Sequence, residues 1–126
     1  MGLFRCETKG TYSVVICPEI IDANSIKQLT VLSTSWLDLS AKLYVFDFKA
    51  VEALNPAIYR NFVSMNQSFK AKKIALMSIN LSRKLLSQIK SDGVESVFSV
   101  AAKLEDALIR AGLADTAPIA KPPGSI

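Results

Sequence analysis

Apolar and polar residues alternate near the start of the chain, and this pattern predicts a β-hairpin over residues 3–8 and 11–17. Both segments are rich in β-branched or aromatic residues, which favour strands. We place the turn at Lys9-Gly10. Pro18 would end the second strand, because proline has no N–H to donate to a sheet.

This register has a consequence for the two cysteines. It places Cys6 opposite Ser13 and Cys17 opposite Gly2, so the cysteines do not face each other. We therefore expect no disulfide between them. Both are expected to be small buried residues.

Strand patterns then alternate with helical ones. Residues 43–48 and 74–79 are apolar on both faces, which predicts central strands covered on both sides. The 4-3-4 spacing of Ile58, Phe62, Met65 and Phe69 predicts the buried face of a helix opened by Asn55-Pro56. A further helix is expected to end at about Leu37 and to begin either at the capping box Ser25-Ile26-Lys27-Gln28 or at Asn24. Another is expected to begin at Asn80 or Ser82 and to end at Asp92-Gly93. A short strand over 94–100 and a helix over 101–111 complete the pattern.

The order of these elements, β-β-α-β-α-β-α-β-α, predicts an α/β fold. We expect a mostly parallel mixed sheet of about five strands with an antiparallel edge, flanked by about four helices. One domain would span residues 1–112. Residues 113–126 contain three prolines and little apolar mass, so we expect a disordered C-terminal tail.

Composition agrees with one globular domain. Half of the 126 residues are hydrophobic and 21% are charged. No apolar run approaches the ~20 residues that span a bilayer, and the first residues lack the apolar region of a signal peptide. We expect a cytoplasmic protein.

The chain has no histidine, and this excludes several kinds of site. A Ser-His or Cys-His nucleophile pair cannot be built within it, and a closed zinc site is not expected. Asp22 and Asp47 form no cation or acid-base site without a third ligand. A nucleotide at the helix start capped by Asn55 is disfavoured, because Pro56 removes an N–H donor. We expect no enzyme, no catalytic residue, no metal and no cofactor.

The net charge is +4, and its cations gather on the predicted helices. Interleaved aromatic residues or a nucleic-acid-binding motif do not accompany them, so no nucleic-acid partner is expected. Solvated helix faces are the simpler interpretation, and an anionic partner is the alternative. The residues are Lys70, Lys72, Lys73, Arg83, Lys84 and Lys90.

Three stretches together resemble the STAS domain, the fold of anti-sigma factor antagonists. Residues 21–29 resemble the family's segment leading into its first helix, with Asp22 before a capped helix. Residues 45–54 resemble the central strand and its approach to the regulatory loop. Residues 92–98 followed by 104–108 resemble the closing Gly-strand-helix signature. The resemblance covers about residues 3–112 and implies the STAS fold.

The chain departs from the family at the regulatory loop. Switch members of the family read Asp-Ser-Ser/Thr-Gly there, and a partner kinase phosphorylates the second hydroxyl residue. The matching residues are Asn55, Pro56, Ala57 and Ile58. Ala57 thus stands at the phosphoacceptor position without a hydroxyl, so that switch cannot operate there.

The resemblance implies a non-catalytic module that binds a regulatory protein, such as an anti-sigma factor or a serine kinase. The alternative is a STAS subunit or regulator of a lipid or anion transport system, which would meet a membrane only through its transporter. A homodimer, and the identity of partner and pathway, stay open. The candidate partner-binding residues are Asp22, Asn24, Asn55, Pro56, Ala57, Tyr59 and Arg60.

Each candidate also has a plainer structural interpretation. Asp22 and Asn55 are suited to helix caps, and Pro56 to the first position of a helix. Tyr59 could pack under a neighbouring helix instead of anchoring an interface. Ser64 and Ser68 are either alternative phosphosites or, more simply, solvated helix serines.

Overall fold

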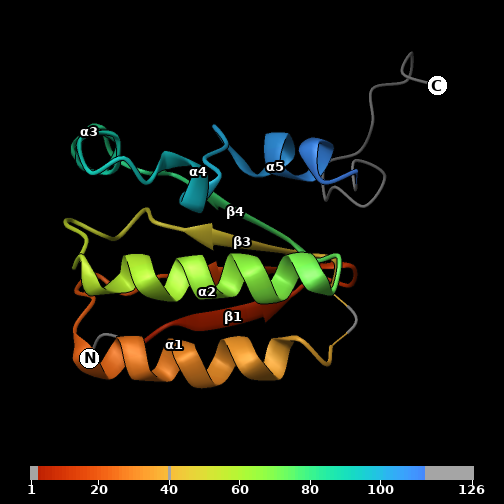
Figure 1. Cartoon of the computed structure of the whole chain (residues 1–126). Coiled ribbons are helices and arrows are strands. Elements are labelled where there is room, and N and C mark those ends of the chain that lie inside the picture. Colours follow the sequence, from red (N-terminus) through yellow and green to blue (C-terminus); the bar gives the residue numbers. More distant parts are fainter. Residues whose placement is uncertain (1–2, 40, 113–126) are drawn as a thin grey trace, which may run out of the picture.

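The computed structural model describes residues 3–39 and 41–112, and these form a four-stranded mixed sheet with helices on both faces (Figure 1). The tail predicted at 113–126 lies outside these residues. The strands lie in the order β1-β2-β3-β4, with β1 antiparallel to β2 and the other neighbours parallel. The strands are β1 (Arg5–Thr8), β2 (Tyr12–Ile16), β3 (Leu43–Asp47) and β4 (Ala75–Ile79).

Five helices accompany the sheet in this part of the chain. Figure 1 shows α1 and α2 side by side along the sheet, and these two helices contact each other. The last helix contacts β3 and β4 from the other face. The helices are α1 (Ala23–Trp36), α2 (Ala57–Ala71), α3 (Arg83–Ser91), α4 (Glu95–Phe98) and α5 (Leu104–Arg110).

The predicted pattern of burial is confirmed in β3 and α2. Tyr44 and Phe46 of β3 point into the larger core under α1 and α2, while Leu43 and Val45 join the smaller core under α5. All four are fully buried, as expected for a central strand. The face of α2 predicted from the 4-3-4 spacing is buried in full.

The predicted hairpin exists, but its register was wrong. Cys6 lies opposite Val15, not Ser13. The turn has Gly10 and Thr11 at its centre, because Lys9 pairs with Tyr12 through an N–H···O bond of 2.8 Å. Gly10 takes φ 86°, the positive value that tight hairpin turns need at this position.

The prediction for the cysteines was half right. Both thiols are free, and Cys17 is buried as expected. Cys6 is exposed, because it lies on β1, an edge strand whose four residues are all exposed.

The fifth strand predicted over 94–100 was wrong. Glu95–Phe98 forms the one-turn helix α4, which ends where Ser99 takes a left-handed φ of 50°. The strand is reduced to one bridge between Val100 and Ser78 of β4. Side chains from distant elements hold the helical turn: Ser78 Oγ donates to the Phe98 carbonyl (2.7 Å), and Asn66 Nδ2 donates to the Val97 carbonyl (2.6 Å).

Two predicted helix starts also shift. The cap of α1 is Asp22, because its carboxylate accepts the Ser25 N–H while Ser25 Oγ accepts the Asp22 N–H. This confirms the cap interpretation of Asp22, and the alternatives Ser25 and Asn24 were wrong. Pro56 is the cap residue of α2, one position before the first helical residue where we expected it. Ser82 caps α3, one of the two predicted alternatives.

Candidate functional site

The candidate residues gather at one end of the sheet. Strands β2, β3 and β4 are parallel, so the loops that follow them leave from the same edge. Figure 1 shows that α1 and α2 both begin at this end. Asp22 and Asn24 at the start of α1 therefore lie on the same side of the fold as Asn55 and Ala57 at the start of α2.

The β3–α2 loop (residues 48–56) is held to α3 by one amide side chain. Gln88 Oε1 accepts the N–H of Leu54 (3.3 Å), and Gln88 Nε2 donates to the carbonyl of Leu54 (2.9 Å). Leu54 is buried, so these bonds satisfy backbone groups that would otherwise lack a partner. The loop is thus fixed just before the exposed residues that begin α2.

Tyr59 connects α2 to the end of α3. Its hydroxyl donates to Asp92 Oδ2 (2.5 Å) and accepts a bond from Gln88 Nε2 (3.1 Å). Its ring meets the Phe98 ring edge-on, with centroids 5.8 Å apart. Burial first, and then Asp92, raise the pKa of Tyr59 to about 12. Tyr59 is half-buried under its neighbours, which agrees with the predicted alternative that it packs against a neighbouring helix.

The start of α2 is exposed and well ordered by its own residues. Asn55, Pro56 and Ala57 are all exposed. Asn55 Oδ1 accepts the N–H of Ala57 (3.0 Å), and its carbonyl accepts the N–H of Ile58 (2.9 Å). Asn55 therefore satisfies terminal N–H groups of the helix from the position before the cap. The methyl group of Ala57 faces solvent at the place where the resemblance expects a phosphoacceptor.

The second part of the end surface is the start of α1. Asp22 and Asn24 are both exposed. The N–H of Ser25 stabilises the Asp22 carboxylate and holds its pKa below the ordinary value. Asp22 thus carries a negative charge at the helix start, where an anion is stabilised.

Asp47 and Asn80 order the loops between these helix starts. Asp47 Oδ1 accepts the N–H of Lys49 (2.9 Å) and Nδ2 of Asn80 (3.1 Å). Asn80 occupies a left-handed conformation with φ 60°, which this bond helps to fix. The carboxylate joins the ends of β3 and β4, and so acts in support of the loops.

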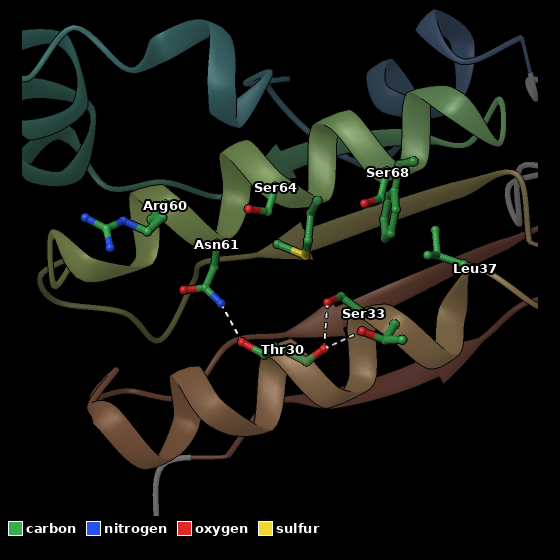
Figure 2. Close-up of a pocket in the computed structure, with 10 residues that line it drawn as sticks. Thr30, Ser33, Leu37, Arg60, Asn61, Ser64 and Ser68 are labelled. Carbon is green, nitrogen blue, oxygen red and sulfur yellow. Dashed lines mark hydrogen bonds between the residues drawn. The ribbon is translucent and has the colours of Figure 1, made fainter.

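Arg60 lies one step further, at a groove between α1 and α2. Arg60, Asn61 and Ser64 of α2 line this groove together with Thr30 and Ser33 of α1. Figure 2 shows Asn61 pointing toward Thr30, whereas the Arg60 side chain extends away from α1. The groove has a volume of about 270 Å³. Asn61 Nδ2 donates to Thr30 Oγ1 (2.7 Å), the hydrogen bond that links the two helices in Figure 2. Arg60 is exposed and supplies the positive charge of the groove.

The groups exposed at the helix starts are polar or small. Among residues 3–39 and 41–112, no three His, Cys, Asp or Glu side chains gather as metal ligands. No helix in the same ranges is long and apolar enough to cross a bilayer. The exposed groups at the helix starts are a carboxylate, two amides, a proline ring and a methyl group, which suit contact with another surface.

Several residues that shape the site escaped the sequence analysis. Gln88, Asp92 and Asn80 hold its loops, and Thr30 pairs with Asn61. Each acts on a partner 29 or more residues away along the chain. The one local signal was the pair Asp92-Gly93, which marked the end of α3, next to Tyr59 in space.

Comparisons with known proteins identify the fold. No protein-family model matches the sequence, and no curated protein matches it either. The similar solved structures include three at 11–15% identity whose alignments cover 86% of this chain. They are an RsbS variant of Moorella thermoacetica (TM-score 0.72, 15% identity, 94% of that chain), the anti-sigma factor antagonist SpoIIAA in its unphosphorylated form (0.72, 14%, 96%) and a STAS domain protein of Planctomyces limnophilus (0.73, 11%, 97%).

A structure of SLC26A9 is also similar, with a TM-score of 0.58 and 11% identity. The alignment covers 81% of this chain and 20% of that one. The TM-scores of 0.72 and 0.73 confirm the fold that the resemblance predicted. This chain has the STAS fold, the fold of the anti-sigma factor antagonists.

Proposed function

We propose that this protein is a non-catalytic STAS interaction module that binds a regulatory protein through the end of the sheet where α1 and α2 begin. The partner would be an anti-sigma factor or a serine kinase. The observation that carries the proposal is the start of α2: Asn55, Pro56 and Ala57 are exposed, yet their loop is fixed by Gln88. A surface ordered before binding loses less conformational entropy in the complex.

The proposal includes the absence of a phosphorylation switch at the usual position. Ala57 has no hydroxyl, and no serine or threonine occurs between Asn55 and Asn61. Phosphorylation would add nearly two negative charges and three acceptor oxygens, enough to disrupt an interface. Without it, the module would be permanently competent to bind, with its activity set by its abundance.

The test is affinity purification of the tagged chain from its own cells, followed by mass spectrometry. Ala57→Glu places a carboxylate on the exposed helix start and is expected to abolish capture of the regulatory partner. Ile109→Glu on α5 is the matched control, because Ile109 is 62% exposed and lies at the other face of the sheet. A kinase or anti-sigma factor captured equally by all three chains would contradict the proposed surface.

Phosphate analysis of the native protein tests the second half of the proposal. Intact-mass measurement is expected to show no phosphate. Stoichiometric phosphate on Ser64 or Ser68, the serines that follow on α2, would contradict permanent competence.

A second candidate function is regulation of a membrane transport system. The similarity to SLC26A9 favours it, as do the exposed lysines at the end of α2 and directly after it, which are Lys70, Lys72 and Lys73. Such a protein would be recovered with membranes through its transporter, and Lys72→Glu combined with Lys73→Glu would release it. Recovery away from membranes for both chains would exclude this function.

A further inference from the structure

The outer edge of β4 is only half paired by backbone hydrogen bonds. In a parallel strand, the backbone groups of alternate residues point to opposite sides. Ala75 and Ile79 bond toward β3, through Ala75 N–H to the Lys42 carbonyl (2.8 Å) and the Ile79 carbonyl to Phe48 N–H (3.0 Å). The backbone groups of Leu76 and Ser78 therefore point outward.

These two outward residues differ in their partners. Ser78 donates to the Ser99 carbonyl (3.2 Å) and accepts from Ala101 N–H (2.8 Å), which together form the single bridge that replaces the predicted strand. Leu76 has no such partner for its outward N–H and carbonyl within residues 3–39 and 41–112. The outward backbone N–H and carbonyl of Leu76 are thus unpaired, whereas those of Ser78 are paired.

A groove of about 630 Å³ lies against this open position, and we call it the β4 edge groove. Val63, Asn66 and Lys70 of α2, residues 74–77 of β4 and its approach, and Val97 of α4 line this groove. Val63 is 41% exposed, so an apolar contact is available beside the free backbone groups.

The groove carries positive charge, which favours a ligand with an acidic group. Lys70 and Lys73 line it, and both are exposed. No acidic side chain among the described residues lines the groove, and neither lysine forms an ion pair with the described part of the chain. The site therefore combines unpaired strand positions with uncompensated positive charge.

We propose that the β4 edge groove binds a short extended segment of a protein partner that carries an acidic residue, adding it to the sheet beside Leu76. Strand addition uses backbone bonds for affinity and alternate side chains for selection. The segment pairs over about three or four residues, because Ser99–Ala101 occupies the edge beyond Leu76. Its carboxylate lies near Lys70 and Lys73.

A second copy of this chain fits the groove less well. Its own β4 would have to continue past Leu76 into the stretch that Ser99–Ala101 fills. It would also bring another Lys73 toward the groove instead of an anion. The inferred surface lies beside the C-terminal half of α2 and is separate from the helix starts of the proposed function, so it stands or fails independently.

The test is a titration of the ¹⁵N-labelled full chain with the peptide acetyl-Glu-Val-Thr-Val-Glu-amide. A glutamate at each end allows either strand direction. The expected shifts occupy residues 63–77 and 96–99. Hydrogen exchange of the free chain is expected to be faster at Leu76 than at Met77, whose N–H faces β3, and the peptide is expected to slow it.

Two controls separate strand pairing from simple charge attraction. A peptide with N-methyl groups on its three central residues keeps both carboxylates but cannot pair, and is expected to lose binding. Lys70→Glu with Lys73→Glu is expected to weaken binding about tenfold. Lys27→Glu with Lys84→Glu has the same net charge at exposed positions elsewhere and is expected to bind normally.

The results that would overturn the proposal are equally distinct. An absence of shifts at millimolar peptide, shifts away from the β4 edge groove, or equal binding of the N-methylated peptide would each refute strand addition. Anionic phosphatidylserine vesicles that perturb Lys70 and Lys73 without slowing exchange at Leu76 would assign the lysines to lipid instead.

Discussion

Replacing Gln88 with alanine is expected to loosen the β3–α2 loop at a measurable cost in stability. The substitution removes both bonds to Leu54 and one of the two bonds of the Tyr59 hydroxyl. Leu54 is 5% exposed, so its N–H and carbonyl would be left largely without water. Each unsatisfied buried group costs about 1–3 kcal/mol.

The net effect is smaller than the sum of these costs. Alanine is the better helix former by a few tenths of a kcal/mol, and the loop can shift to reach water. We expect Gln88→Ala to lower the free energy of unfolding by about 2–3 kcal/mol. Gln88→Glu keeps an acceptor for the Leu54 N–H but loses the donor to the Leu54 carbonyl and to the Tyr59 hydroxyl, and it sets a carboxylate against both oxygens, so it is expected to cost at least as much.

Urea unfolding followed by tryptophan fluorescence measures this effect. Trp36 is the one tryptophan, is 3% exposed and stacks on Tyr44, so its emission changes when the core opens. With ordinary slopes, the expected loss moves the midpoint by about 1 M or more. Ser87→Ala is the control, because Ser87 is exposed on the same helix and should change stability by less than about 0.5 kcal/mol. If Gln88→Ala unfolded at the midpoint of this control, the amide would not hold the loop.

Three further predictions concern titration and reactivity. The pKa of Tyr59 is raised to about 12, so the folded state favours the neutral phenol. Its contribution to stability is therefore retained below pH ~10 and declines as the pH rises from about 10 toward 12. Tyr59→Phe is expected to flatten that decline in alkaline melting curves. The pKa of Asp22 is lowered, so its contribution is present above pH ~4 and lost as pH falls through the folded value; Asp22→Asn keeps a capping side chain and should melt with less dependence on pH between 5 and 3. Ellman's reagent is expected to modify one thiol of the native chain, that of Cys6, although partial burial raises the pKa of this thiol. Cys6→Ser should abolish the reaction until urea exposes Cys17. Two rapidly reacting thiols in the native chain would contradict the burial of Cys17.

Local periodicity predicted the elements whose burial is decided within a few residues. The spacing from Ile58 to Phe69 placed one face of α2, and the two-sided apolar pattern of 43–48 placed β3 at the centre of the sheet. The same kind of reasoning failed for residues 94–100. Their β-branched residues favour a strand, but bonds from Ser78 and Asn66, 20 and 31 residues away, hold a helical turn.

The candidate site was predictable in position and not in its supporting contacts. The loop before α2 was recognised because Asn55-Pro56 begins a helix directly after a buried strand. Asp22 was recognised as a possible cap of α1, but the capping box was placed three residues too late. The sequence pattern fits Ser25 with Gln28, whereas the reciprocal bonds form between Asp22 and Ser25. Gln28 instead bonds the backbone of Phe4, 24 residues away. Such long-range partners carry no local signal.

Phe98 links a one-turn helix to the start of α2. Its ring lies 4.5 Å from Phe62, 5.8 Å from Tyr59 and 5.9 Å from Phe48, measured between ring centroids. A helix of four residues is not stable by itself, so α4 depends on these ring contacts together with the bonds from Ser78 and Asn66. Substitutions in residues 94–99 that displace Phe98 are therefore expected to loosen the first turns of α2. Among descendants of this chain, substitutions at Phe98 and at Tyr59 or Phe62 are expected to arise together as compensating pairs.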